Sequence, residues 1–211
     1  MKKTLWLDLE TTGLDAAKHG IIQIAMLMEI DDKIEGELLI DIQPFSEDIL
    51  NIKDIEFEYG DIAFIDKIKV DDIIESSGIK MIDIIQKHIK SKEAYQKIIK
   101  FLDGYISRFD KLDKAFLGGY NVQFDRGFIS AFFKKNGDYY LGSYLNWKLL
   151  DPLYLLWQMD ADGFISLENY KLETTCNHFG IEISAHNALS DVKATYELYR
   201  KLRRENESKE A

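Results

Sequence analysis

Residues 4–14 read Thr-Leu-Trp-Leu-Asp-Leu-Glu-Thr-Thr-Gly-Leu. Leucine occupies positions 5, 7 and 9, while Trp6, Asp8 and Glu10 occupy the positions between and after them. Because successive side chains of a strand point to opposite faces, this alternation predicts a strand over residues 4–10. The leucines indicate that the strand is buried. Asp8 and Glu10 therefore leave one face together, close to the end of the strand.

Two more strands are expected directly after the first. Residues 21–30 form a nearly continuous apolar run, which is typical of a buried strand, and residues 34–42 form a third strand. The turn-like Asp31-Asp32-Lys33 joins them. A connection this short predicts antiparallel pairing, so the first three strands are expected to form a meander.

The second half of the chain alternates between helical and strand-like patterns. Pro152 marks the start of one helix and Gly180 the end of another. The predicted helices cover residues 92–109, 124–134, 168–179 and 188–202, besides the one starting at Pro152, and the predicted strands cover 114–120 and 147–151. The fold class is therefore α/β: a mixed five-stranded sheet, three antiparallel strands followed by parallel ones, flanked by helices.

The length of 211 residues favours a single domain spanning residues 1–211. Residues 45–90 mix acidic turns with isoleucine-rich stretches, and we interpret them as an insertion packed on the core, with short helices near 71–76 and 80–88. Residues 203–211 form a charged C-terminal tail, expected to be a frayed helix end.

Composition limits the class of partner and the location. With 27 basic and 37 acidic residues the net charge is −10, which argues against clamping a long duplex, because phosphate neutralisation supplies most non-specific affinity. It does not exclude an enzyme whose bound cations meet the phosphates.

Cys176 is the only cysteine and is interpreted as a core thiol. No signal peptide is recognisable and no apolar run approaches the ~18 residues of a membrane span. We expect a soluble, cytoplasmic protein with no membrane partner.

Asp8 and Glu10 are the first candidate metal ligands. Two carboxylates on one face repel each other unless protons or a cation separate them, and hard oxygen ligands suit Mg²⁺ or Mn²⁺. For an isolated Asp-x-Glu, a surface pair on an edge strand is the commoner structure, but the flanking leucines point to a buried strand. The following residues offer hydroxyls, backbone N–H groups and one exposed apolar side chain. They are candidates for binding the end of a nucleotide: Thr11, Thr12, Gly13 and Leu14.

Two later blocks add further polar groups. Asp125 lies in the first turn of a predicted helix, one turn after Asn121, with Phe124 beside it. Its position is equally explained by the favourable interaction of an acid with the helix dipole, and Phe124 is interpreted as a core residue that could also stack on a base. Asp191 lies inside the last helix, and His186 precedes that helix on a loop, where a neutral imidazole can accept a proton near pH 7.

The other polar candidates have ordinary structural explanations. Asp151, directly before Pro152, is interpreted as a helix N-cap. His88 and His178 are interpreted as surface or packing residues, and His19 has no setting comparable with that of His186.

Together, the three blocks resemble those of the DEDDh 3′–5′ exonucleases, the group that includes the proofreading subunit of bacterial DNA polymerase III, ribonuclease T and oligoribonuclease. The resemblance covers residues 4–30 and about 114–200. A histidine five residues before the last aspartate corresponds to the histidine branch of the group. Five matching positions in order are far more specific than any single block: Asp8, Glu10, Asp125, His186 and Asp191.

The resemblance implies an RNase H-like fold with the site at the end of the sheet, and two Mg²⁺ or Mn²⁺ ions as cofactors. It implies that Asp8, Glu10 and Asp191 hold the first ion, that Asp8 bridges to the second, and that Asp125 binds the second mainly through water. His186 is then the general base. The loop from Thr11 to Leu14 would receive the terminal nucleotide, with Leu14 as a wedge against the next base; Asn121 and Phe124 belong to the same substrate site.

The activity implied is Mg²⁺-dependent hydrolysis of single-stranded or frayed 3′ ends, releasing nucleoside 5′-monophosphates in proofreading, replication or repair. We expect DNA as the substrate, with RNA, as in an exoribonuclease, as the alternative. A polymerase or replisome subunit is a candidate partner. The competing hypothesis from another class is a non-catalytic nucleic-acid-binding or replisome module that has kept the fold.

Overall fold

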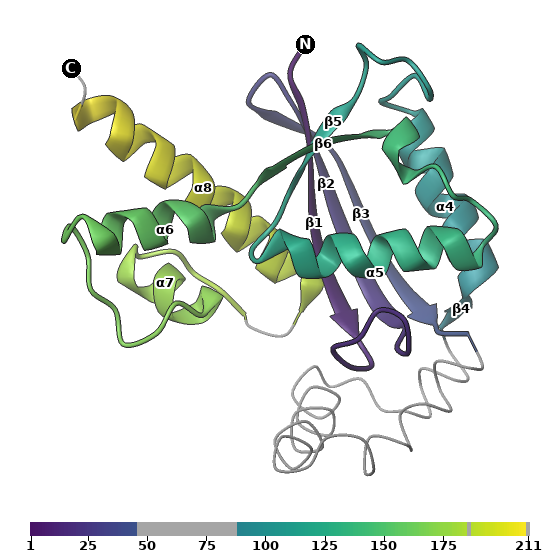
Figure 1. The fold of residues 1–211 in the computed structure, drawn as a ribbon, viewed down its shortest axis with the longest axis horizontal. Helices are drawn as coiled ribbons and strands as arrows, with labels where there is room; N and C mark the ends of the chain where they lie inside the picture. The colour runs from purple at the N-terminus through teal and green to yellow at the C-terminus, as the bar shows by residue number, and fades with distance from the viewer. Residues whose placement is uncertain (46–87, 185–186, 210–211) are drawn as a thin grey trace.

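The computed structural model describes residues 1–45, 88–184 and 187–209. Its centre is a mixed six-stranded sheet with the strand order β4-β3-β2-β1-β5-β6 (Figure 1). The strands are β1 (Lys3–Thr11), β2 (Ile21–Ile30), β3 (Lys33–Gln43), β4 (Ile89–Lys90), β5 (Ala115–Gly118) and β6 (Leu145–Leu150). β1, β2 and β3 pair antiparallel, and the pairs β1/β5, β5/β6 and β3/β4 are parallel. The predicted three-strand meander followed by parallel strands is confirmed.

The prediction of five strands was wrong by one. β4 has only two residues, pairing Ile42 with Ile89 and Gln43 with Lys90. So short a strand cannot show an alternating pattern, and the sequence therefore gave no sign of it.

Helices cover both faces of the sheet. They are α4 (Ser91–Asp103), α5 (Val122–Lys135), α6 (Pro152–Ala161), α7 (Leu172–His178) and α8 (Ala188–Lys209), with a 3₁₀ turn, η1, at Leu141–Ser143. The odd-numbered leucines of β1 share a core with Ile98 of α4 and Phe128 of α5. On the opposite face, Trp6 packs with Ala188 and Val192 of α8. Figure 1 shows α5 crossing the strands, with α6 and α7 beside the sheet.

Helix boundaries differ from the predictions where side chains or turns compete with the helix. α4 ends at Asp103 rather than 109, because Gly104 and Tyr105 turn back onto its last carbonyls. α7 starts at Leu172 rather than 168, because the Asn169 side chain accepts hydrogen bonds from the Lys171 N–H and the Thr174 hydroxyl. α8 continues through the predicted tail to Lys209. Gly180 follows α7 with φ +66°, as expected for a C-terminal cap.

The turn from β5 to α5 lies unusually close to β1. A Cβ on Gly118 would lie 2.6 Å from the Trp6 ring, and one on Gly119 would lie 2.8 Å from the Leu7 carbonyl oxygen. Only glycine fits at either position. The close approach brings the first turn of α5, and Asp125 with it, next to the end of β1 that carries Asp8 and Glu10.

Some predictions concern residues that the structure does not describe. Most of the predicted insertion at 45–90, with its short helices, and the catalytic candidate His186 lie outside the described residues. The single domain over residues 1–211 stays a prediction. Within the described ranges, no helix is both long and apolar enough to span a membrane.

Candidate metal centre

Three carboxylates from two elements meet at one end of the sheet. Asp8 and Glu10 come from β1, and Asp191 comes from the first turn of α8. One oxygen of each lies within 4.8 Å of the others. The strand alternation that predicted a shared face for Asp8 and Glu10 is thus confirmed, and α8 supplies the third acid from 181 residues further along the chain.

The electrostatics of the cluster disfavour its negative charge. Burial, and then the charge of Asp191, raise the pKa of Glu10 to about 7. The pKa of Asp8 is raised well above its ordinary value by burial and by the charges of Asp125, Asp191 and Glu10. Within the protein alone, these carboxylates therefore tend to retain protons, which a cation would replace.

Asp125 joins this field from α5. It is 4% exposed, and burial followed by the charge of Asp151 raises its pKa, while backbone hydrogen bonds from itself and Leu9 lower it. Its charge raises the pKa of Asp8, and the charge of Glu10 raises the pKa of Asp125, yet Asp125 is outside the group of three whose oxygens converge. This placement fits a carboxylate that reaches a cation indirectly.

The donor set fits hard divalent cations. Only carboxylate oxygens converge, without sulfur or described nitrogen ligands, which is the chemistry of Mg²⁺ and Mn²⁺ sites. A cation also removes the repulsion between buried like charges that raises their pKa values.

Gln23 holds the start of α8 against the sheet. It lies opposite Glu10 in the β1/β2 register, is 7% exposed, and its side-chain oxygen accepts the backbone N–H of Ala188 at 3.0 Å. Its amide nitrogen donates to Asp41 at 2.7 Å. Sequence reasoning missed this role, although a lone glutamine inside the apolar run 21–30 was the available signal.

Asp151 plays the corresponding part for α5. As predicted, it caps α6, accepting the Leu153 N–H at 3.0 Å. It also accepts the N–H groups of Asn121 and Val122 at 3.2 and 3.0 Å. One carboxylate therefore fixes the starts of two helices, including the one that carries Asp125.

The loop after β1 is held by its own side chains. The Thr11 hydroxyl donates to the Gly13 carbonyl at 2.8 Å, and the Thr12 hydroxyl accepts the Gly20 N–H at 3.0 Å. Both threonines are buried, whereas Leu14 is 55% exposed. Substrate contact through the threonine hydroxyls stays a prediction; in this structure they shape the loop.

His19 was passed over in the sequence and has a structural role here. It is 8% exposed, its Nδ1 lies 3.4 Å from the Thr12 hydroxyl, and a Cβ on Gly13 would lie 2.7 Å from its ring. The ring therefore packs inside the loop that joins β1 to β2, against Thr12 and Gly13 at its start.

The remaining site candidates lie near the start of α5 or belong to the core. Asn121 is exposed at the α5 N-cap with φ 55°, and its side chain makes no capping bond. Phe124 is half-buried, with its ring 4.8 Å from that of Phe128. Cys176 is fully buried, which confirms a core thiol, and burial raises its pKa to about 12.

Comparison with known proteins agrees with this architecture. A family profile described as exonuclease (RNase_T) matches residues 5–199. The PolC-type DNA polymerase III of Halalkalibacterium halodurans is 26% identical over 189 residues, covering 89% of this chain but 10% of that protein. The oligoribonuclease of Ralstonia nicotianae is 26% identical over 172 residues, 79% of this chain and 68% of that one.

Solved structures share the fold. E. coli exonuclease I in complex with a dT13 oligonucleotide superposes with a TM-score of 0.69 at 20% identity, over 96% of this chain and 41% of that one. The zinc-bound form of the exonuclease I–single-stranded DNA complex gives a TM-score of 0.70. The chain thus spans a tenth of the polymerase and about two fifths of exonuclease I.

The fold is therefore RNase H-like, as the resemblance implied. Since the matching profile covers nearly the whole chain, this protein belongs to the RNase_T exonuclease family of RNase H-like 3′–5′ exonucleases.

Proposed function

We propose that this protein is a Mg²⁺-dependent 3′–5′ exonuclease that releases nucleoside 5′-monophosphates from single-stranded or frayed 3′ ends. The observation that carries the proposal is the convergence of Asp8, Glu10 and Asp191 at the end of β1, in a member of an exonuclease family. Mn²⁺ is expected to replace Mg²⁺, because both ions prefer the same oxygen ligands.

The residues divide the work as follows. Asp8, Glu10 and Asp191 would hold one divalent cation, and Asp8 and Asp125 would contribute to holding a second. When bound, two such ions lower the pKa of the attacking water and stabilise the attacking and leaving oxygens of the displacement. His186 accepts the proton of the attacking water.

We assign the binding site for the 3′-terminal nucleotide of the substrate to the β1–β2 loop and the start of α5. Exposed Leu14 lies between the terminal base and its neighbour, and the backbone around Thr11, Thr12 and Gly13 receives the terminal sugar. Asn121 and Phe124 complete this site from α5. The exposure of Leu14 and Asn121 supports the assignment.

We favour DNA as the substrate. The related structures include exonuclease I complexes with dT13 and dA16, and the polymerase relative is a DNA polymerase, which makes a polymerase a candidate partner. The second candidate is an exoribonuclease, because the oligoribonuclease relative is matched over most of its own length. A reduced, cytoplasmic setting remains our expectation.

End-labelled oligonucleotides test the activity. A 5′-labelled single strand should yield a ladder of progressively shorter products in Mg²⁺, and a 3′-labelled strand should yield labelled mononucleotide at once. Asp8→Asn, which removes one charge at nearly constant volume, should reduce the rate at least ~10³-fold, since metal-centre charge stabilisation is worth several kcal/mol. Asp162→Asn, at an exposed position after α6, serves as the charge-matched control and should cut normally.

Internal cutting, degradation from the 5′ end, or full activity in Asp8→Asn would overturn the proposal. Binding without cutting by wild-type protein would favour the non-catalytic module instead. Rates on DNA and RNA of the same sequence decide the substrate: a faster rate on RNA would replace DNA with the exoribonuclease alternative.

A further inference from the structure

A groove of about 630 Å³ runs along α5 on the side facing β6. One wall is formed by α5 residues Arg126, Ser130 and Lys134. The opposite wall is formed by the edge strand β6, from Leu145 to Trp147. Lys111 and Lys114, from the segment before β5, close the far end.

The lining of this groove is strongly basic in an acidic protein. Among the described residues that line it, four are cationic, namely Lys111, Lys114, Arg126 and Lys134, whereas the chain carries a net charge of −10. Among the described residues, Lys111, Arg126 and Lys134 make no ion pair. The Lys114 ammonium donates to the Gly142 carbonyl, which leaves its charge uncompensated.

Asp138, the single acid among the described residues of the groove, is already paired. Asp138 is 9% exposed, forms an ion pair with Arg108, and accepts the Tyr95 hydroxyl at 2.7 Å. These partners keep its pKa below the ordinary value despite burial, so it stays an ion bound to Arg108 rather than to a groove lysine.

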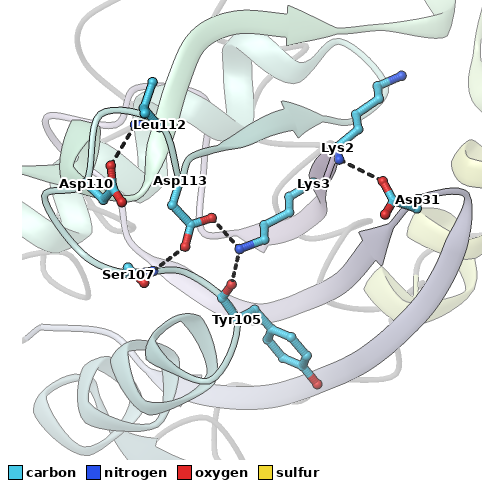
Figure 2. Close-up of polar contacts among 8 residues, drawn as sticks. All are labelled: Lys2, Lys3, Asp31, Tyr105, Ser107, Asp110, Leu112 and Asp113. Atoms are coloured by element: carbon cyan, nitrogen blue, oxygen red, sulfur yellow. Dashed lines mark hydrogen bonds and ion pairs between the residues drawn. The ribbon is translucent and has the colours of Figure 1, made fainter.

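The acidic side chains beside Lys111 also have partners already (Figure 2). Asp113 binds the Lys3 ammonium and accepts the Ser107 N–H at 2.9 Å, while Asp110 accepts the Leu112 N–H at 2.8 Å. These contacts hold the loop before β5 in its conformation, and they use the carboxylates of Asp110 and Asp113. Lys111 is exposed on that loop.

Exposed aromatic rings accompany the cations. Trp147 is 76% exposed and Tyr139 is 68% exposed, and both line the groove. Cationic side chains interleaved with exposed aromatic rings are the combination that binds single-stranded nucleic acid, because phosphates meet the charges and bases stack on the rings.

One end of the groove follows a site residue directly along α5. Arg126 directly follows Asp125 in the first turn of α5, and Lys134 lies eight residues further, or ~12 Å along the helix at ~1.5 Å per residue. Lys111 and Lys114 precede β5, which runs parallel to β1, so they lie at the opposite end of the sheet from the carboxylates. A strand following the groove would leave the metal centre in one direction.

We propose that this basic groove binds the sugar–phosphate backbone of a single-stranded nucleic acid whose 3′ end lies in the metal centre. The proposal rests on the proposed function for the polarity of the strand. It adds a length preference: an oligomer long enough to reach Lys134 and Lys111 binds more tightly than a dinucleotide confined to the carboxylates.

The test removes two of the groove lysines, Lys111 and Lys134, and measures binding separately from cutting. Lys111→Ala/Lys134→Ala is compared with Lys97→Ala/Lys193→Ala, which loses the same charge from exposed ion pairs on α4 and α8 outside the groove. Fluorescence anisotropy in EDTA gives the Kd of labelled 20-mers, dT and rU. In Mg²⁺, the KM values of a 20-mer and a dinucleotide are compared.

The groove pair should raise the Kd of the 20-mer about tenfold and lower the slope of log K against log salt by ~1.4, because two phosphate contacts are lost at ~0.7 each. The 20-mer KM should rise in parallel, with less than a twofold change for the dinucleotide. Trp147→Ala should weaken the 20-mer further. Tighter binding of dT or of rU identifies which strand the groove prefers.

Equal weakening in the two lysine pairs, or unchanged 20-mer binding in the groove pair, would overturn the proposal. Displacement of the 20-mer by polyglutamate at equal charge would also overturn it, by showing that the groove accepts any acidic chain. Binding in EDTA needs no hydrolysis, so wild-type protein that binds through the groove without cutting would contradict only the proposed function.

Discussion

At the scale of single residues, the site concentrates negative charge where burial makes that charge costly. Asp8 and Glu10 have raised pKa values because they are enclosed and face Asp191. A protein that needed only stability would not keep three carboxylates together in this way. Their persistence at the end of a buried strand is explained if a cation occupies the cluster.

Gly13 permits the tight packing of the loop beside this cluster. In Gly13→Ala the new Cβ would lie 2.7 Å from the His19 ring, closer than real contacts allow, so the ring or the loop must move. We expect about a tenfold to hundredfold loss of kcat on an oligonucleotide, because small displacements of groups near the reacting atoms lower the reaction rate strongly. Steady-state kinetics measure it.

Gly127→Ala is the matched control, because its added Cβ would meet only Ala16, at 3.9 Å, within a helix. That variant should keep wild-type kinetics and gain slightly in stability, as alanine is the better helix former. Unchanged activity in Gly13→Ala would show that the packing of His19 against the loop is unimportant.

At the scale of elements, strand and helix ends position the acids. The sequence predicted the strand carrying Asp8 and Glu10 and the helices carrying Asp125 and Asp191, because alternation and helical spacing are local patterns. It could not predict how the starts of α5 and α8 are fixed. Asp151 reaches Asn121 from 30 residues away, and Gln23 reaches Ala188 from 165 residues away.

The errors in the predicted elements have the same origin. β4 exists only because two residues meet β3 across a long stretch of chain, and α7 starts late because Asn169 bonds its neighbours. Neither event leaves a periodic signal. His19 was overlooked because its role depends on packing against Gly13 rather than on its place in a motif.

Gln23→Leu tests the link between β2 and α8. The substitution introduces an apolar side chain of similar size and removes the acceptor of the Ala188 N–H and the donor to Asp41. We expect a loss of ~1–3 kcal/mol in the free energy of unfolding, since a buried N–H and a carboxylate lose partners. Activity should fall about tenfold as Asp191 shifts.

Urea unfolding and kcat supply the two readouts for this variant. Gln96→Leu, at an exposed site on α4, is the control and should change neither quantity by more than a small factor. Full activity in Gln23→Leu would mean that α8 keeps Asp191 in place without this hydrogen bond.

At the scale of the whole molecule, the protonation of the cluster is linked to stability, and metal binding there would be linked to both. Folding raises the pKa of Glu10 from 4.5 to about 7, so the folded state retains a proton that the unfolded chain has lost. The stability from this group is complete below pH ~4.5 and falls until pH ~7, by on the order of 3 kcal/mol. Asp8 and Asp125 act in the same direction.

Thermal unfolding of wild-type protein and Glu10→Gln in EDTA should therefore converge at pH 5 and diverge by pH 8, where the wild type is the less stable. Mg²⁺ should raise the Tm of the wild type more at pH 8 than at pH 5, because the cation favours the ionised carboxylates. Asp113 and Asp138 have lowered pKa values, so their contributions to stability change with pH in the opposite direction. Both residues are present in the two proteins, so these contributions cancel in the difference between them. Equal Mg²⁺ effects at the two pH values would contradict this linkage.

We expect the carboxylates at the end of β1 to form a divalent-metal centre. The most direct test of this expectation is an anomalous difference map from crystals soaked in Mn²⁺ near pH 7.5. We expect density in contact with oxygens of Asp8, Glu10 and Asp191, which is lost in Asp8→Asn. Saturating Mn²⁺ without density at these three residues, in crystals whose site is open to solvent, would contradict it.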